Sequence, residues 1–164
     1  MLPPQDWLIT DTHFNHAKII ELCSRPQNSQ QLIIENWQRL VRPEDTVFHL
    51  GDVIFSRASE LKPILDSLPG KKILVRGNHD MNKSQWYVDR GFTFVCYGLE
   101  HQHAYMTHKP SKHLPEGCTV NIHGHLHNTP HRDAEYEPRP YHRLLSIELE
   151  NYTPILLSDF LKRG

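Results

Sequence analysis

No apolar stretch in the sequence approaches the ~18 residues that a helix needs to span a bilayer. Residues 1–6 lack the basic start and the apolar core of a signal peptide. The formal net charge is only −1, so the chain has no general electrostatic attraction for nucleic acids or anionic membranes. We therefore expect a soluble, cytoplasmic protein that binds no membrane and has no general affinity for nucleic acid.

Cysteine is scarce, and Cys23, Cys96 and Cys118 are far apart, with no CxxC pair among them. An odd number of widely spaced cysteines indicates neither a disulfide framework nor a cysteine zinc site, so we expect buried free thiols. Histidine is abundant by contrast, with 13 residues. The informative question is which of these histidines gather in one place.

The length of 164 residues suits one domain with a sizeable core, and we interpret residues 1–164 as a single domain. Short apolar runs bounded by turn residues predict strands at 7–10, 46–50, 72–76, 92–97, 102–107, 119–123 and 144–149. Apolar residues at helical spacing predict helices at 16–22, 29–41, 59–68 and 83–90. The long stretch 128–141 has neither pattern and is interpreted as a functional or disordered loop.

The order of these elements indicates the fold class. The first half alternates strands with helices, whereas the second half has closely spaced strands with little helix between them. This arrangement is typical of an α/β sandwich with a mixed or antiparallel sheet.

Residues of the kinds that bind metals follow three consecutive strands of the first half. Asp11 and His13 follow the first strand, Asp52 follows the second, and the Gly-Asn-His-Asp segment 77–80 follows the third. Open α/β sheets bind their ligands at the carboxyl ends of the strands. The recurrence of such residues at that end predicts that the sheet gathers them into one site.

Two further segments of this kind come from the second half. His108 follows the strand predicted at 102–107, and the Gly-His-Leu-His segment 124–127 follows the strand predicted at 119–123. Glycine permits the tight turn that would present two imidazoles together. Imidazole and carboxylate groups suit divalent transition metals, whereas the lack of thiolates argues against a closed structural zinc site, and calcium prefers oxygen ligands.

The order D-x-H, G-D, G-N-H-D, H and G-H-x-H, which spans Asp11 to His127, resembles the calcineurin-like metallophosphoesterases. The resemblance implies an α/β fold, a four-layer α/β/β/α sandwich of two mixed sheets flanked by helices. It also implies that Asp52 bridges two metal ions. The other ligands that it implies are Asp11, His13 and His127 for one metal, and Asn78, His108 and His125 for the other.

The resemblance implies hydrolysis of phosphate esters by attack of a metal-bridging hydroxide, with His79 as the general acid and Asp80 orienting it. Imidazole titrates near neutral pH, which suits an acid that protonates a leaving oxygen. The cofactors would be two divalent ions, with manganese expected and iron, zinc or nickel as alternatives. The partner would be a small phosphate ester, with a nucleotide as one candidate, and a phosphodiester is favoured over a monoester.

Two alternatives remain open at this point. A noncatalytic scaffold of the same fold would keep a metal but turn over no ester. A nuclease acting on polynucleotide would show salt-sensitive binding to DNA or RNA, against which the near-zero net charge argues. The sequence does not indicate the oligomeric state.

Four residues are candidates for substrate contacts. His16 lies about one turn beyond His13, with exposed helix surface as the alternative role. Arg57 and Arg76 could each support a phosphate, with ordinary salt bridges as the alternative. Arg139 belongs to a loop with tyrosines nearby, which suits a nucleotide, although the acidic residues of this loop favour a solvated loop. His49, in a strand, is interpreted as a buried, hydrogen-bonded residue, and His123, before the Gly124 turn, as a residue that supports the ligands without binding metal.

Overall fold

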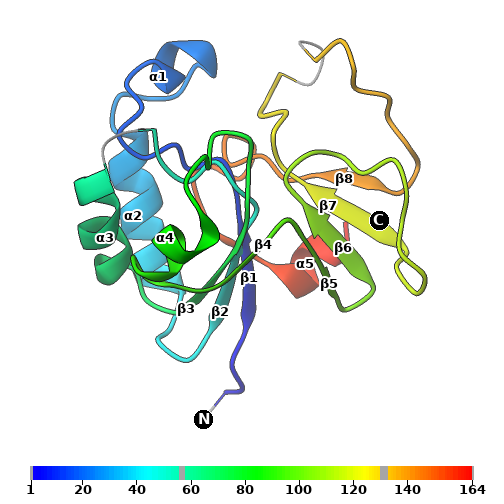
Figure 1. The fold of residues 1–164 in the computed structure, drawn as a ribbon, viewed down its shortest axis with the longest axis horizontal. Helices are drawn as coiled ribbons and strands as arrows, with labels where there is room; N and C mark the ends of the chain where they lie inside the picture. The colour runs from blue at the N-terminus through cyan, green and yellow to red at the C-terminus, as the bar shows by residue number, and fades with distance from the viewer. Residues whose placement is uncertain (1, 56–57, 130–132, 164) are drawn as a thin grey trace.

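The computed structural model describes residues 2–55, 58–129 and 133–163. Its larger sheet has five strands in the order β4-β3-β2-β1-β9, and Figure 1 labels the first four of them. The first four strands along the chain are parallel, and β9 pairs with β1 in the antiparallel direction. The strands are β1 (Asp6–Ile9), β2 (Thr46–His49), β3 (Lys71–Val75), β4 (Phe92–Cys96) and β9 (Ile155–Leu156).

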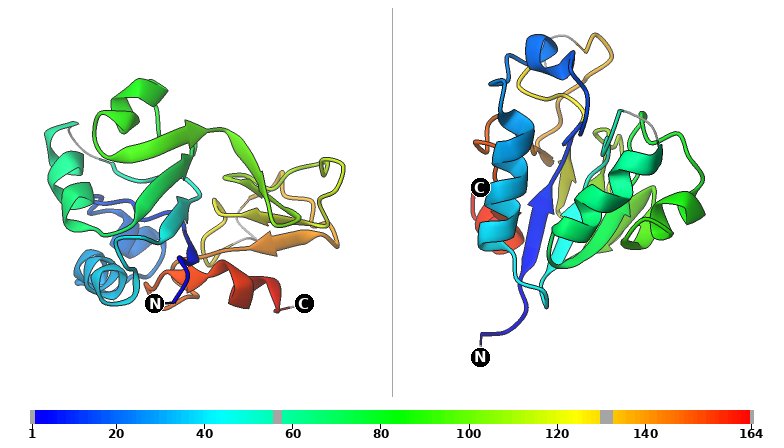
Figure 2. Two further views of the ribbon diagram at one scale, coloured as in Figure 1. Left: turned by 90° about the horizontal axis from the view of Figure 1, so that it is seen from below. Right: turned by 90° about the vertical axis from the view of Figure 1, so that its left-hand side faces the viewer.

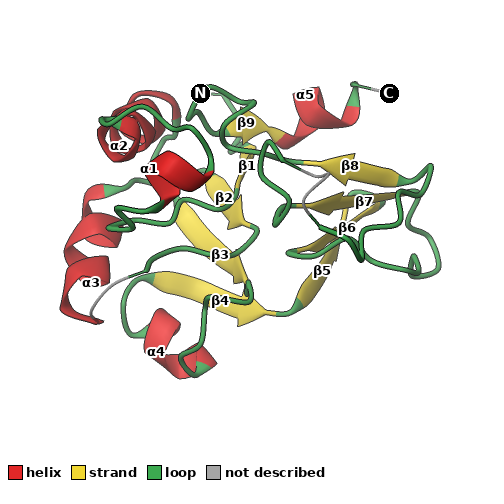
Figure 3. Cartoon of the chain, turned by 90° about the horizontal axis from the view of Figure 1, so that it is seen from above, coloured by secondary structure: helices red, strands yellow, loops and turns green. Residues whose placement is uncertain are grey.

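The smaller sheet has four strands in the order β5-β6-β7-β8. The β5 and β6 strands are antiparallel, whereas β6, β7 and β8 are parallel. The chain passes directly from one sheet to the other between β4 and β5 (Figure 3). The strands are β5 (Gly98–His101), β6 (Ala104–Thr107), β7 (Val120–His123) and β8 (His142–Leu144).

Helices flank these sheets. Three of them, α2 (Ser29–Leu40), α3 (Ala58–Ser67) and α4 (Ser84–Val88), cover the face of the five-stranded sheet that is turned away from the other sheet (Figure 2). The short α1 (Ile19–Leu22) follows the loop after β1, and α5 (Leu157–Leu161) follows β9. The expected α/β fold of two mixed sheets with flanking helices is confirmed. Over the described ranges, no helix has the length and apolar character needed to cross a bilayer.

The strands β1 and β2 are buried on both faces, which explains their continuous apolar character. In β1, Trp7 and Ile9 pack in the core beneath the helices, while Leu8 packs in the core between the two sheets. The next strand repeats the pattern with Val47 and Phe48. Because helices and the second sheet cover the two faces, the loops at the strand ends are the place where polar groups can gather.

The prediction of a strand at 144–149 is wrong, because β8 ends at Leu144 and turns follow from Ile147. Leu145 packs in the core between the sheets and Ile147 packs in the core beneath the helices. The alternation of apolar residues over 144–149 therefore comes from a segment that crosses from one core to the other, and not from a strand. The predictions also omitted β5, β9 and α5. All three cysteines are free, but only Cys23 is fully buried.

The buried carboxylate of Asp45 connects the start of β1 to the segment before β2 by hydrogen bonds. Asp45 accepts hydrogen bonds from the backbone N–H of Gln5, the Trp7 indole, and the backbone N–H, Nε and Nη2 of Arg42. Burial alone would raise the pKa of Asp45, but the hydrogen bonds from Arg42, Gln5 and Trp7 hold it well below its usual range. The ionised form of Asp45 therefore stabilises the fold.

We expect Asp45→Asn to lower the free energy of unfolding by about 2 kcal/mol at pH 7, because the amide carries no charge and accepts fewer hydrogen bonds. The folded-state pKa lies below the unfolded value of about 3.9. The contribution is therefore present above the unfolded pKa and is lost as the pH falls through the folded-state pKa. Urea unfolding of both proteins at pH 7 and pH 3 should show a difference that shrinks at pH 3; an equal difference would contradict a role for the charge.

Candidate metal centre

Hydrogen bonds fix the loops that follow β1, β2 and β3 against one another. The backbone N–H of Asp11 donates to the carbonyl of Gly51 at 2.9 Å, and that of His13 donates to the carbonyl of Asp52 at 3.0 Å. The Asp80 carboxylate accepts from the backbone N–H groups of Gly77 and Asp52, at 2.7 and 2.8 Å, and of Val53 at 3.1 Å. One buried side chain thus joins the loops after β2 and β3.

The loop after β7 reaches the same place from the other sheet. The backbone N–H of His125 donates to Asp11 Oδ2 at 3.0 Å. Gly124 makes this approach possible, because a Cβ at that position would overlap Asp11 Oδ2 and Thr10 Oγ1. The glycine of the G-H-x-H motif is therefore required by the contact between the two sheets.

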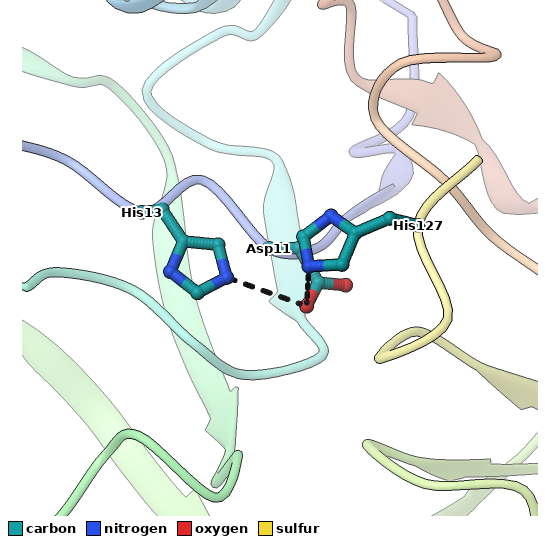
Figure 4. Close-up of side chains that lie close together, drawn as sticks. All are labelled: Asp11, His13 and His127. Carbon is teal, nitrogen blue, oxygen red and sulfur yellow. Dashed lines mark ion pairs between the residues drawn. The ribbon is translucent and has the colours of Figure 1, made fainter. Parts of the chain in front are cut away.

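The first group of candidate ligands consists of Asp11, His13 and His127. Both imidazoles point toward the same oxygen, Asp11 Oδ1, which lies 3.9 Å from His13 Nε2 and 3.7 Å from His127 Nε2 (Figure 4). Asp11 and His13 are buried. Among the described residues, Asp11 Oδ1 and both ring nitrogens of His13 have no hydrogen-bond partner. Buried polar atoms without partners are costly, so a cation that accepts lone pairs from Asp11 Oδ1 and from His13 Nε2, the nitrogen that faces it, fits this site.

The second group consists of Asp52, His108 and His125. Asp52 Oδ2 lies 3.3 Å from His108 Nε2, and the Asn78 amide oxygen lies 3.0 Å from the same nitrogen. His108 Nδ1 donates to the Leu50 carbonyl at 2.7 Å, which leaves Nε2 as the nitrogen that faces the site.

Asp52 also connects the two groups, since its Oδ2 lies 3.7 Å from His13 Nε2. The structure therefore brings together all seven of the side chains that the sequence predicted as ligands.

Five of these seven residues have a left-handed backbone, which non-glycine residues rarely adopt. The φ angles lie between 45° and 69° for Asp11, His13, Asp52, His125 and His127. Such conformations cost of order 1–3 kcal/mol each and persist where the surroundings impose them, typically at functional sites. The cluster of strained residues in these loops therefore supports a functional centre.

Burial and charge affect the histidines of the centre differently. Burial lowers the pKa of His13 to about 2 and that of His125 to about 4, which keeps both imidazoles neutral and able to bind a metal. Burial would also lower the pKa of His127, but Cys23, Glu148 and Asp11 raise it to about 10. The neighbours of His127 favour its protonated form, so a cation that binds His127 would have to displace that proton.

Two residues that support this centre, Arg25 and Glu148, were not predicted from the sequence. Glu148 Oε1 accepts from His127 Nδ1 at 2.9 Å and from Arg25 Nη2 at 2.7 Å, while Ser146 donates to Oε2. Arg25 also donates to the backbone carbonyls of Asp11 and Thr12. Cys23, His127 and Glu148 form another possible metal-binding group. Because Glu148 already accepts from three side chains, we favour the group that contains Asp11.

We expect Glu148→Gln to weaken metal binding about 10–100-fold, because groups that orient a ligating histidine typically have effects of this size. Calorimetric titration of the metal-free protein with manganese would measure the change in affinity. Glu150→Gln is the matched control, since Glu150 pairs with Arg163 instead. Equal affinities in the Glu148 variant and the control would contradict a positioning role.

His79, the predicted acid, lies at the exposed rim of the centre. Its backbone N–H donates to Asp52 Oδ1 at 2.9 Å, and its ring lies 5.6 Å from that of His13. Asp80 is buried and binds backbone amides of the same loops. Any influence of Asp80 on His79 therefore passes through the loop backbone that both residues share.

The candidate substrate contacts differ in their positions. The His16 ring lies 5.4 Å from that of His13, so this residue faces the centre. Arg76 donates to the carbonyl of Asp80 and to the Tyr97 hydroxyl, contacts that favour the structural alternative. Arg139 donates to Glu137 in the loop before β8. Arg57 lies outside the described residues.

His49 and His123, neither of which is predicted as a ligand, are both buried. His49 Nε2 lies 2.9 Å from Thr12 Oγ1 and its Nδ1 accepts from the Gly51 N–H. His123 Nδ1 lies 3.0 Å from the Gly124 carbonyl, directly before the turn that carries His125.

Comparison with known proteins gives a consistent result. Residues 7–139 match the calcineurin-like phosphoesterase superfamily domain. An uncharacterized protein of Methanocaldococcus jannaschii is 34% identical, and the match covers 95% of this chain and 89% of that protein. A protein of unknown function from Aquifex aeolicus has a similar structure, with a TM-score of 0.73, 25% identity and coverage of 98% and 100% of the two chains. A nuclease of Pseudomonas putida shares the fold at a TM-score of 0.54 and 20% identity, over 74% of this chain and 61% of the nuclease.

Proposed function

Because the chain belongs to the calcineurin-like phosphoesterase superfamily, we propose that it is a metal-dependent phosphohydrolase that cleaves phosphodiesters in preference to monoesters. The observation that carries the proposal is the meeting of two groups of candidate ligands around Asp52. We assign Asp11, His13 and His127 to one metal, Asn78, His108 and His125 to the other, and Asp52 to both.

The donor set fits divalent transition ions, since it combines neutral imidazoles with carboxylate and amide oxygens. The partnerless atoms of Asp11 and His13 support the fit. When bound, the two ions would polarise the phosphoryl oxygens and make water a nucleophile near neutral pH. Manganese is the ion we propose.

The residues of the chain carry out the remaining steps. His79 donates a proton to the leaving oxygen, a role that its exposed position at the rim of the centre supports. Asp80 keeps the loops after β2 and β3 together, which fixes the backbone that carries His79. We propose that residues 1–164 perform these steps as one domain.

Hydrolysis of bis-p-nitrophenyl phosphate and p-nitrophenyl phosphate by the manganese-loaded protein tests the proposal. We expect turnover of both, with the higher kcat/KM for the diester. Absence of turnover with metal bound would overturn the proposal and favour the scaffold. Salt-sensitive binding and cleavage of polynucleotide, without hydrolysis of the small esters, would favour the nuclease instead.

A further inference from the structure

A groove opens beside His79 and shares three histidines with the candidate metal centre. It has a volume of about 540 Å³ and reaches His13, His79 and His127 at its inner end. This volume lies within the range of roughly 300–1,000 Å³ that is typical of ligand pockets. The outer part runs along α1 and the loop that carries Phe55.

Apolar atoms make up most of the wall of this groove. Ile19 and Cys23 are buried in the wall, whereas Leu22 is 54% exposed and Phe55 is 53% exposed. Apart from histidines, Lys18 is the one charged side chain among the described residues that line the groove, and none of those residues is acidic. Large apolar side chains beside a polar centre indicate a surface that binds an apolar group.

Phe55 is held in place, although its ring is exposed. Its backbone N–H donates to the carbonyl of Phe14 at 3.0 Å, and its ring packs on that of His16 at 4.0 Å. The same ring lies 5.9 Å from His79. An aromatic group bound against Phe55 would therefore lie next to the proposed acid.

We propose that this groove holds the leaving group of the substrate, and that the leaving alcohol carries an aromatic ring, as a nucleoside does. The inference rests on the proposed function, because the acid identifies the side on which the leaving group departs. Hydrolysis forms a bond between the oxygen of water and phosphorus and breaks the bond from phosphorus to the leaving oxygen. The leaving oxygen takes the proton of His79, and the proton that the water loses restores His79 to its protonated form. An aromatic ring on that alcohol stacks on Phe55, and Leu22 and Ile19 cover its edge.

A second groove provides the contrast. It is lined by Lys109, Lys112, Arg139 and three acidic residues, one of which, Asp133, lies 3.6 Å from His125 Nε2. The rings of Tyr136 and His142 stack in it, with their centroids 5.9 Å apart. Because charges of both signs line it, this groove suits a polar substituent better than an aromatic ring. The aromatic ring of the substrate could instead stack on Tyr136, so the experiment compares substitutions of Phe55 and Tyr136.

Binding of phenylphosphonate and methylphosphonate to the manganese-loaded chain, measured by calorimetry, tests the inference without requiring turnover. Phenylphosphonate should bind about tenfold more tightly, an effect typical of one aromatic stacking contact. Phe55→Ala should remove this preference, whereas the matched control Tyr136→Ala should keep it. Methylphosphonate affinity reports whether each variant still forms the metal centre.

Two outcomes would overturn the inference: equal binding of the two phosphonates to the unaltered protein, or a preference that survives in Phe55→Ala and is lost in Tyr136→Ala. Hydrolysis of bis-p-nitrophenyl phosphate, measured on the same samples, separates this inference from the proposed function. Turnover without the phenyl preference would refute the groove assignment alone. A phenyl preference without turnover would show that the groove binds aromatic groups, but it would refute the phosphohydrolase and with it the assignment of the leaving group.

Discussion

Asp52→Asn should lower the occupancy of both metal sites and lower turnover of a phosphodiester by about 10³-fold. Asp52 Oδ2 lies between His13 of the first group and His108 of the second, so one substitution removes a charged oxygen from both. A metal supplies several kcal/mol of charge stabilisation, and ~1.4 kcal/mol corresponds to tenfold in rate. The substitution preserves the size of the side chain, so the change in charge is the main effect.

Metal content per chain, measured by elemental analysis after dialysis against a fixed manganese concentration, provides the direct readout. Asp66→Asn is the matched control, because Asp66 forms an exposed pair with Lys62 on α3. Loss of one metal while the other stays bound at the level of the control would show that Asp52 serves a single site. The proposed bridge would then be wrong.

His79→Asn should leave the metal content unchanged and lower turnover by about 10²–10⁴-fold for an ester whose leaving alcohol needs a proton. For a p-nitrophenyl ester the loss should be about tenfold or less, because p-nitrophenolate departs without protonation. Comparing the two leaving groups therefore identifies the step in which His79 acts. Phosphorus NMR measures the rate of hydrolysis of the alkyl ester, and absorbance measures that of the p-nitrophenyl ester.

His113→Asn is the control for this substitution, since His113 is exposed and lies outside the centre. It should not alter either rate. If His79→Asn instead lost metal, His79 would belong with the ligands. If it slowed both esters equally, a role in protonating the leaving group would be contradicted.

Much of this site was predictable from sequence because it lies at the ends of strands. The strands predicted at 7–10, 46–50 and 72–76 match β1, β2 and β3 to within one residue, and parallel pairing brings their carboxyl ends to one edge. Motif residues directly after those strands must then be neighbours. The same reasoning placed His108 after β6 and His125 after β7.

The supporting residues were not predictable in this way. Arg25 lies in a loop after α1, and Glu148 lies 123 residues further along the chain, in a turn that was predicted to be a strand. A buried ion pair between such distant positions has no local pattern. Likewise, the left-handed backbone of Asp11 or His127 results from contacts between loops and is not a preference of these residue types.

The crossing segment after β8 determines how much of the chain the site requires. All five motifs lie before residue 128, and the family match ends at residue 139. The carboxylate that holds His127 lies beyond that point, as does β9, which pairs with β1 directly before Asp11. A fragment chosen by its motifs would therefore contain every proposed ligand but lack the support for two of them. A unit that keeps this site intact therefore extends at least as far as β9.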